Sequence, residues 1–385
     1  KQKTAYEIVS RDWSSDVCSS DLVSQKYVEP VLRRHAEKWP SNDIRYGWKL
    51  LSFEDRGDHV TARIQAASGD GPERTVRARY LIGADGPRSM VRHQLGISYE
   101  GATGMRRAYM GGQMFAVYVR LPEFYARMLH ARAWMYVTVN HERRALLASV
   151  DGVQDFAFHA SLSEREEAQD WGEPQAREVL RQALGTDMPM EILNCQTWTA
   201  GHALVAQELS RGHVFLIGDA AHLFTPTGGL GYNTGVEDAV NLGWKLAAVI
   251  RGEAGAGLLD TYDPERRPYA EEVCTWQVAN LGERRSMEDV TFKVGKPMDH
   301  ATMMFGYVCP QGALVPEGDG PGELFDDPKK PSGRPGARIP YVSLQGPDGP
   351  VSPRALLGPY FMAFTAAPEG PARIESAARA EGAAK

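Results

Sequence analysis

The segment from Val214 to Asn233 constrains the fold of this chain more than any other. Residues 214–217 (VFLI) form a continuous apolar run, which is typical of a strand buried on both faces of a parallel sheet. Gly218 and Asp219 follow it, then residues 225–233 (TPTGGLGYN), and then a helical pattern. This order predicts a buried strand with a carboxylate at its carboxyl end, a Gly-rich turn and a helix N-terminus. Ligands of open α/β sheets bind at that edge.

The residue types of this segment suit a flat, polar ligand. The free N–H groups and the positive dipole end of the helix would stabilise an anion or a polarised carbonyl. Glycines at 228, 229 and 231 let the backbone approach a ligand without interference from a Cβ atom. Asp219 is placed to accept hydrogen bonds from sugar-like hydroxyls. A purely structural interpretation stays open, in which Asp219 caps the turn and the glycines form only a tight loop.

A second segment, residues 80–92 (YLIGADGPRSMVR), repeats the order of strand, Asp-Gly turn and helix. Arg88 and Arg92 are available in it for phosphate groups or for pairing with Asp85. By itself this segment is a weak signal, because Asp-Gly turns are common.

Hydrophobic periodicity places the remaining elements. Helices are expected at 28–36 with Pro30 in the first turn, at 163–184, at 234–251 with a capping box from Thr234 and Glu237 and a stop at Gly252, and at 263–285. Strands are expected at 45–53, 59–66, 75–81, 114–120, 134–140, 145–150 and 191–200, the second and third joined by a hairpin at 68–72. The pattern predicts an α/β fold in which an antiparallel sheet with helices on one side is inserted between two pieces of an α/β unit.

The two Asp-Gly segments, in this order and with a sheet domain between them, resemble the class A FAD-dependent aromatic monooxygenases of the para-hydroxybenzoate and phenol hydroxylase type. The resemblance covers about residues 23–285 and is most specific through 214–268. It implies that Asp219 holds the ribityl chain of FAD and that the Pro226 carbonyl faces the substrate beside the reactive part of the flavin, as the one catalytic position. The cofactor-binding residues that it implies are Gln25, Asp85, Gly86, Arg88, Gly218, Asp219, Pro226, Gly228, Gly229, Leu230, Gly231, Tyr232 and Asn233.

One departure from that family is large. The family opens with a strand–turn–helix that carries G-x-G-x-x-G and binds the ADP pyrophosphate, and this sequence contains no such motif. Residues 1–22 closely resemble translated sequencing-adapter read-through, with a disordered native tail as the alternative. We therefore expect an incomplete Rossmann-like FAD-binding domain whose G-x-G-x-x-G half is missing.

The expected domain organisation follows from these segments. Proline-rich residues 310–353 and the run at 336–342 resemble the approach to a thioredoxin-like C-terminal domain that is cut short. The expected divisions are 1–22 as a non-native segment, 23–100 with 201–285 as the partial FAD-binding domain, 101–200 as the substrate-binding sheet domain, 286–353 as a connector and 354–385 as the start of the truncated domain.

The resemblance implies hydroxylation of a phenolic or other aromatic substrate through a flavin C4a-hydroperoxide, with FAD, NADH or NADPH and O₂. An epoxidase or N-hydroxylase of the same fold stays open, as does an inactive fragment without FAD. Candidates for the substrate wall are Met114, Tyr118, Trp134 and Tyr136, although alternating aromatic residues in a strand are also typical of plain core. His222 is either a base or a buried structural histidine.

Composition narrows the partners. Lys and Arg total 43 and Asp and Glu total 49, for a net charge of −6, which argues against a general nucleic-acid binder. Four scattered cysteines and the lack of a CxxC or HExxH motif predict neither a disulfide framework nor a metal site. No apolar run is long enough to span a membrane. We expect a cytoplasmic protein with a small aromatic substrate, and a homodimer is the assembly considered.

Overall fold

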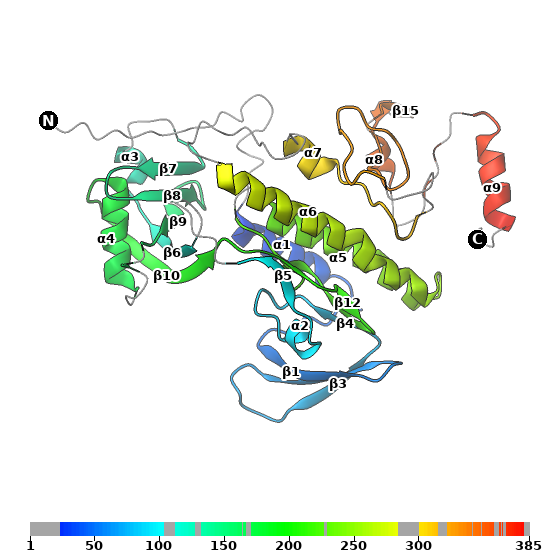
Figure 1. Ribbon diagram of the computed structural model, residues 1–385, viewed down its shortest axis with the longest axis horizontal. Helices are drawn as coiled ribbons and strands as arrows, with labels where there is room; N and C mark the ends of the chain where they lie inside the picture. The colour runs from blue at the N-terminus through cyan, green and yellow to red at the C-terminus, as the bar shows by residue number, and fades with distance from the viewer. Residues whose placement is uncertain are drawn as a thin grey trace. The chain divides into compact units, whose positions relative to one another are not determined.

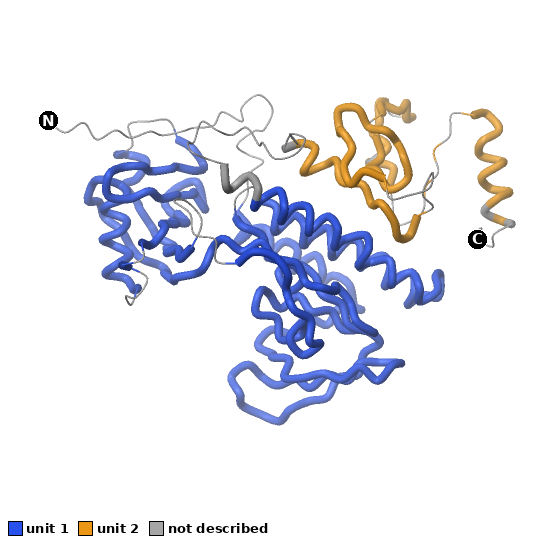
Figure 2. Tube along the Cα trace, viewed as in Figure 1, with its two compact units in different colours: residues 1–297 blue, residues 298–385 orange. Residues whose placement is uncertain are grey.

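The computed structural model divides into two compact units, residues 1–297 and 298–385, which are described separately (Figures 1 and 2). The residues that the structure describes are 24–103, 112–127, 132–163, 165–166, 171–226, 229–283, 300–314, 322–340, 342–347, 349–357, 362, 364 and 367–380.

The first unit has a mixed α/β fold with antiparallel sheets (Figure 1). Its strands are β1 Trp48–Asp55, β2 Val60–Ala66, β3 Arg74–Ala78, β4 Leu81–Gly83, β5 Tyr99–Ala102, β6 Gly112–Arg120, β7 Met135–Val139, β8 Arg144–Ser149, β9 Asp155–Ser161, β10 Glu191–Ala200, β11 Ala203–Ala206, β12 Ser210–Arg211, β13 Val214–Leu216 and β14 His222–Leu223. Its helices are α1 Gln25–Ala36, α2 Met90–Gln94, α3 Phe124–Arg127, α4 Glu173–Leu184, α5 Leu230–Arg251 and α6 Tyr262–Glu283, with short 3₁₀ turns η2 Gly218–Ala220 and η3 Ala256–Thr261.

A five-stranded antiparallel sheet in the order β10-β6-β9-β8-β7 confirms the sheet that the sequence predicts at 112–200. Successive side chains of a strand alternate between its faces. One face is apolar, with Phe115, Val117 and Phe158 fully or almost fully buried in one core cluster with α4. The prediction missed β9, although its alternating Phe156, Phe158 and Ala160 carry the period-2 signal.

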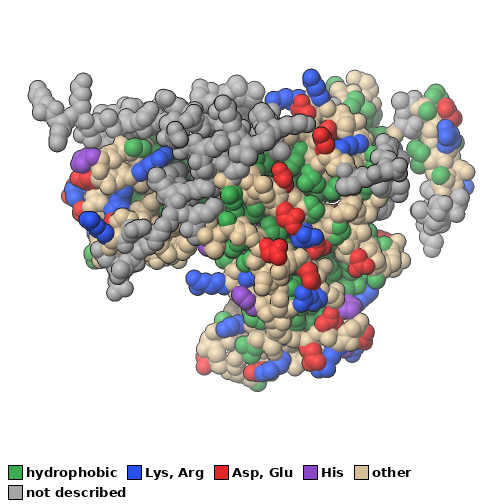
Figure 3. Space-filling view, in the orientation of Figure 1, with side chains coloured by type: hydrophobic (Ala, Val, Ile, Leu, Met, Phe, Trp, Pro, Cys, Tyr) green, Lys and Arg blue, Asp and Glu red, His purple; other side chains and the backbone are tan. Residues whose placement is uncertain are grey.

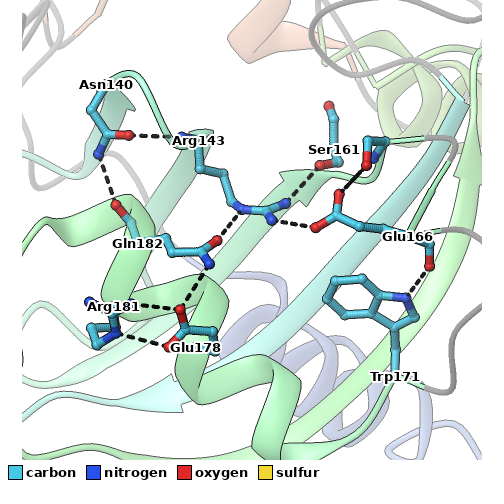
Figure 4. Close-up of polar contacts among 9 residues, drawn as sticks. Asn140, Arg143, Ser161, Glu166, Trp171, Glu178, Arg181 and Gln182 are labelled. Atoms are coloured by element: carbon cyan, nitrogen blue, oxygen red, sulfur yellow. Dashed lines mark hydrogen bonds and ion pairs between the residues drawn. The ribbon is translucent and has the colours of Figure 1, made fainter.

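Helix α4 is shorter than expected. It begins at Glu173 after the N-cap Gly172, whereas the sequence predicted a helix from Ser163. Glu166 instead accepts hydrogen bonds from the Ser163 backbone N–H and hydroxyl, and it pairs with Arg143 at 2.5 Å (Figure 4). Arg143 Nε also donates to Gln182 on α4, so a polar network fastens the helix to the β7–β8 turn (Figure 4).

A second core surrounds the strand at 214–216. β13 pairs in parallel with β4 and antiparallel with β12, and all three β13 residues are buried. The expected third strand at 75–81 is in fact two elements, because β3 ends at Ala78 in the β1-β2-β3 sheet and β4 begins at Leu81 beside β13. The hairpin between β2 and β3 is confirmed.

The helices that follow β13 pack on each other. α6 matches its prediction closely, and α5 ends at Gly252 with a φ of 74°, as predicted. A buried ion pair of 2.7 Å joins Lys245 on α5 to Glu265 on α6. The predicted start of α5 was wrong: the helix begins at Leu230, and the Thr234 hydroxyl lies inside it and donates to the Leu230 carbonyl at 2.8 Å.

Two helical faces remain apolar and exposed. No residue of α1 is buried, and Val31 and Leu32 are each 54% exposed. Pro30 is the sixth residue of α1, so the expectation that it lies in the first turn was wrong. On α5 an exposed stripe at helical spacing comprises Tyr232, Val236, Val240 and Trp244. Acidic and basic side chains are intermixed over the described part of the face drawn in Figure 3.

The second unit contains little regular structure among its described residues. Its elements are α7 His300–Phe305, β15 Leu344–Gly346, β16 Gly349–Val351, α8 Pro353–Leu356 and α9 Gly370–Ala380. Helix α9 has a basic residue, Arg379, in its last turn. A thioredoxin-like identity for this part stays a prediction. Within the described residues of the whole chain, no helix is both long and apolar enough to cross a membrane.

Candidate functional site

The carboxyl end of β13 leads directly into the turn that carries Asp219. Gly218 has a φ of 57°, in the left-handed region that favours glycine, and begins η2. The Asp219 side chain is exposed, and its carboxylate makes no hydrogen bond or ion pair with any described residue. Although the residue is exposed, the protein atoms packed around its carboxylate displace water and raise the pKa of Asp219, and nearby His222 opposes the rise. The structure therefore leaves this carboxylate available to a ligand.

Asp238, on α5, binds this turn through hydrogen bonds to Gly218 and His222. It is fully buried and accepts hydrogen bonds from the Gly218 backbone N–H at 3.1 Å, His222 Nε2 at 2.6 Å and Arg266 Nε at 2.8 Å. Burial alone would raise the pKa of Asp238, but His222 and Arg266 together outweigh burial and lower it. His222 is buried, bonded to Asp238 and stacked on Phe224, which is the structural role that the sequence left open.

Two glycines bring the start of α5 against the turn. A Cβ atom on Gly235 would lie 3.3 Å from Gly218 Cα, tighter than nearly all such contacts. Gly235 is therefore needed for α5 to approach this closely, while Gly218 is favoured by its positive φ.

The N-terminus of α5 is formed by Gly229 and the residues after it. Gly229 has a φ of 66°, and Asn233 Nδ2 donates to its carbonyl at 3.3 Å. The N–H groups in the first turn of a helix have no partners within the helix, so those of Gly231 and Tyr232 are available to a ligand. Leu230 is buried and anchors the turn, while Gly228 lies outside the described residues.

Pro226 precedes this helix on an anchored loop. Gln277 of α6 donates to the Thr225 carbonyl and accepts from the Thr225 N–H, both at 3.1 Å. The Pro226 carbonyl accepts a hydrogen bond of 3.3 Å from the Gly229 N–H. Its expected orientation toward a substrate stays a prediction.

The second Asp-Gly segment is mainly a helix cap. Asp85 accepts from the Ser89 hydroxyl at 2.5 Å and from the Val91 N–H at 3.1 Å, so both of its oxygens hold the start of α2. Gly86 has a φ of 79°, and Arg88 is exposed on the turn. Their expected contacts with FAD stay predictions.

Arg92 joins the two segments, a role that the sequence analysis did not foresee. Its buried guanidinium donates to the Ala220 carbonyl, next to Asp219, and to the Pro87 carbonyl, each at 3.2 Å. It also stacks on the Tyr99 ring at 3.6 Å, and the Tyr99 hydroxyl donates to the Asp219 carbonyl. Arg92 therefore neither pairs with Asp85 nor points freely at a phosphate, which corrects both expectations for it.

Helix α1 connects the predicted flavin contact to the sheet. Gln25 Nε2 donates to Glu29 at 2.6 Å, and the next residue, Lys26, donates to the Tyr118 hydroxyl at 2.7 Å. Tyr118 in turn donates to Asp155 at 3.1 Å. The sheet face that carries Tyr118 thus lies against the start of α1.

The structure separates the four substrate-wall candidates. Met114 and Tyr118 share a face of β6, opposite to the face packed on α4. Tyr136 is 2% exposed and lies in the core between the sheet and α4, where its ring contacts Phe124. It therefore lies on the other face of the sheet and is removed from the substrate-wall candidates. Trp134 is 49% exposed just before β7.

Asp238 and Arg266 are the functional residues that the sequence reasoning missed. In the sequence, Asp238 is a charged residue on the otherwise apolar stripe of α5, and Arg266 is an arginine near the start of α6. Such residues are usually exposed, and only the packing of α5 on α6 shows that these two meet in the core.

Comparison with known proteins decides the family. A family model described as "FAD binding domain" matches residues 4–277. This chain belongs to the class A FAD-dependent aromatic monooxygenases.

The similar relatives are hydroxylases and monooxygenases by name. The chain is 35% identical over 354 residues to aklavinone 12-hydroxylase DnrF of Streptomyces peucetius, covering 91% of this chain and 69% of that protein. It is 35% identical to 4-methyl-5-nitrocatechol 5-monooxygenase of a Burkholderia species, covering 93% and 66%. A solved ternary complex of aklavinone-11 hydroxylase with FAD and aklavinone matches with a TM-score of 0.76 and 31% identity, covering 87% and 62%. The chain thus spans about two thirds of the length of these relatives.

The residues present fit the flavin end of FAD. A free carboxylate suits ribityl hydroxyls, and unpaired N–H groups at a helix N-terminus suit the polarised carbonyl edge of the ring. The space at Gly229 is open, since a Cβ there would meet nothing within 4 Å, and a Cβ at Gly231 would make only an ordinary contact of 3.9 Å with Phe224. Among the described residues, no group of His, Cys, Asp and Glu side chains could hold a metal ion.

Replacing Asp238 by Asn tests the buried network. Breaking one partner of a buried charge pair costs about 3–5 kcal/mol, so D238N should lower the free energy of unfolding by about that amount at pH 7. Because the folded pKa of Asp238 is lowered, its contribution is present above its ordinary pKa and is lost as pH falls through the folded pKa. The gap between wild type and D238N should therefore narrow below about pH 4.

Urea unfolding followed by circular dichroism at several pH values measures this gap. D70N, in the exposed β2–β3 turn, is the matched control and should behave as wild type. Equal stabilities of D238N and wild type at pH 7 would contradict the role given to Asp238.

Proposed function

We propose that this chain is the flavin-binding and substrate-binding part of an FAD- and NAD(P)H-dependent monooxygenase that hydroxylates a phenolic or other aromatic substrate. The observation that carries the proposal is the Asp219 carboxylate, which has no partner among the described residues and lies on a turn that Asp238 and Gly235 of α5 hold in place. The N-terminus of the same helix supplies backbone N–H groups that have no partner within the helix. Family membership supports the cofactor, and the names of the relatives support an aromatic substrate.

Each residue has a distinct task in this proposal. Asp219 would accept hydrogen bonds from the ribityl hydroxyls, and the free first-turn N–H groups of α5, such as that of Tyr232, would stabilise negative charge at the pyrimidine edge, with Asn233 next to them. Asp238 and Arg92 keep the turn fixed for both. When bound, FAD would supply electron transfer from NAD(P)H to O₂ and transfer of one oxygen atom to the ring.

The sheet domain would hold the substrate. Met114 and Tyr118 share one face of β6, and Tyr118 on this face accepts a hydrogen bond from Lys26 of α1. This face of the sheet therefore contacts the helix that begins with Gln25. An epoxidase or N-hydroxylase would use the same flavin site, because the flavin contacts do not depend on the substrate.

The exposed apolar stripe on α5 supports a further part of the proposal. Tyr232, Val236, Val240 and Trp244 are between 41% and 65% exposed, which is unusual for four apolar residues on one helical face. β4 lies at the edge of its three-stranded sheet, with Ile82 43% exposed. We propose that this surface seats a strand–turn–helix unit with G-x-G-x-x-G, which this sequence lacks.

The flavin site and the lack of G-x-G-x-x-G lead to different expectations for the binding of riboflavin, FAD and ADP. The chain should bind riboflavin and FAD with similar affinity, because only the flavin end has its contacts, and ADP should not compete. D219N should weaken the binding of both flavins by about tenfold or more, since a hydrogen bond to a charged group contributes about 1.5–3 kcal/mol and 1.4 kcal/mol is a factor of about ten. Quenching of flavin fluorescence on titration with protein measures all three affinities.

The exposed Asp260 provides the control, and D260N should bind flavin as wild type does. Absence of riboflavin binding would contradict the flavin site. FAD binding far tighter than riboflavin binding, with competition by ADP, would instead contradict the missing ADP-binding half.

Hydroxylation is tested directly with FAD at saturating concentration, NADH or NADPH, and a panel of phenols under ¹⁸O₂. We expect phenols to accelerate NAD(P)H oxidation and to gain one ¹⁸O atom, read by mass spectrometry. Oxidation of NAD(P)H that yields only hydrogen peroxide, with no labelled product from any phenol, would show that the flavin site is present but the aromatic hydroxylase activity is not.

A further inference from the structure

Two buried ring nitrogens without partners lie on the five-stranded sheet. They are Nδ1 of His159 on β9 and Nε1 of Trp198 on β10, and neither has a hydrogen-bond partner among the described residues. The two rings meet edge to face, with centroids 6.0 Å apart and planes at 88°.

The strand register places both side chains on the face that carries Met114 and Tyr118. Trp198 is the cross-strand neighbour of Met114, and His159 is the cross-strand neighbour of Ala116. Cross-strand neighbours project from the same face of a sheet. Met114, Ala116 and Tyr118 alternate with Phe115 and Val117, whose side chains fill the α4 core on the other face. The small Ala116 therefore lies beside His159, and Met114 lies beside Trp198.

The two unpaired nitrogens, His159 Nδ1 and Trp198 Nε1, lower the stability of the folded chain. A buried polar group without a partner costs about 1–3 kcal/mol. The indole N–H can only donate, whereas a neutral imidazole nitrogen can accept. Burial lowers the pKa of His159, so the ring is neutral at pH 7 and one of its nitrogens is an acceptor. A hydroxyl group satisfies both nitrogens, because its oxygen accepts from Trp198 while its hydrogen is donated to His159.

We propose that His159 and Trp198 select a hydroxylated aromatic substrate by binding its hydroxyl group at His159 Nδ1 and Trp198 Nε1. The inference rests on the proposed function and deepens it by naming two residues that discriminate phenols from unsubstituted aromatic hydrocarbons. The surrounding Met114 and Ala116 supply the apolar contact for the ring that carries the hydroxyl. The same face reaches the start of α1 through Tyr118 and Lys26, which places the hydroxyl-binding pair on the side of the sheet that faces the flavin contact.

The test compares 2-naphthol with naphthalene, which differ only in the hydroxyl group. Binding of each to wild type and variants is followed by fluorescence anisotropy of the naphthyl ring. W198F removes the N–H and keeps a ring, and H159Q moves the polar atom away from the position of Nδ1. Each should weaken 2-naphthol by about tenfold, the factor that corresponds to about 1.4 kcal/mol, and leave naphthalene unchanged.

H159N should retain most of the affinity for 2-naphthol, because an Asn amide places a polar atom close to where Nδ1 lies. W39F and H141Q change an exposed tryptophan and an exposed histidine and serve as matched controls with wild-type affinities. Riboflavin affinity should stay at its wild-type value in every variant, and no variant should melt below wild type, since W198F removes an unpaired buried N–H.

The outcomes separate the inference from the function on which it rests. Equal binding of the two compounds in wild type, or no selective loss in W198F and H159Q, would overturn the hydroxyl-binding pair and leave the aromatic site standing. Loss of riboflavin and both naphthyl compounds together in W198F or H159Q would overturn it too, since the residues would then be structural. Absence of binding of either compound to wild type, with riboflavin still bound, would overturn the aromatic substrate as well.

Discussion

The buried carboxylate of Asp238 is the interaction on which the site depends. A charge in the core is tolerated only when donors surround it, and Asp238 has three: a backbone N–H, an imidazole and a guanidinium. Those donors come from the turn after β13, from β14 and from α6, while Asp238 itself belongs to α5. One residue thus fixes four elements, and it leaves the Asp219 carboxylate without a partner among the described residues. The two aspartates therefore differ in environment: Asp238 is buried among donors, and Asp219 is exposed.

Arg92 and Lys26 make two further contacts between segments that are distant in the sequence. Arg92 bridges the second Asp-Gly segment to the first through the Ala220 carbonyl and the Tyr99 ring, so both turns at the carboxyl edge of β4 and β13 form one rigid surface. Lys26 ties α1 to Tyr118 on the inserted sheet. The first contact joins the expected flavin residues of the two Asp-Gly segments, and the second joins the helix of Gln25 to the expected substrate face.

The sequence predicted some of this well and some of it poorly, for physical reasons. The run VFLI and the glycines after it specify a buried strand and a close backbone approach locally, so β13, the turn and α5 were foreseen. The start of α5 was misplaced because Thr234 and Glu237 imitate a capping box, while the actual cap is Gly229 in the left-handed region. Tyr136 was grouped with Met114 because both lie in alternating strands, but which face a residue occupies depends on register across β9 and β8. Asp238, Arg266 and the His159–Trp198 pair were missed because each depends on contacts between distant segments.

Hydrogen–deuterium exchange of the amides at 214–226 and 229–235, with and without saturating riboflavin, tests the central claim most directly. Asp238 is expected to hold Asp219 and the α5 N-terminus in position for the flavin. Riboflavin should therefore slow exchange in these two segments in wild type and do so much less in D238N. Unchanged exchange there in wild type, with protection appearing elsewhere in the chain, would contradict this expectation.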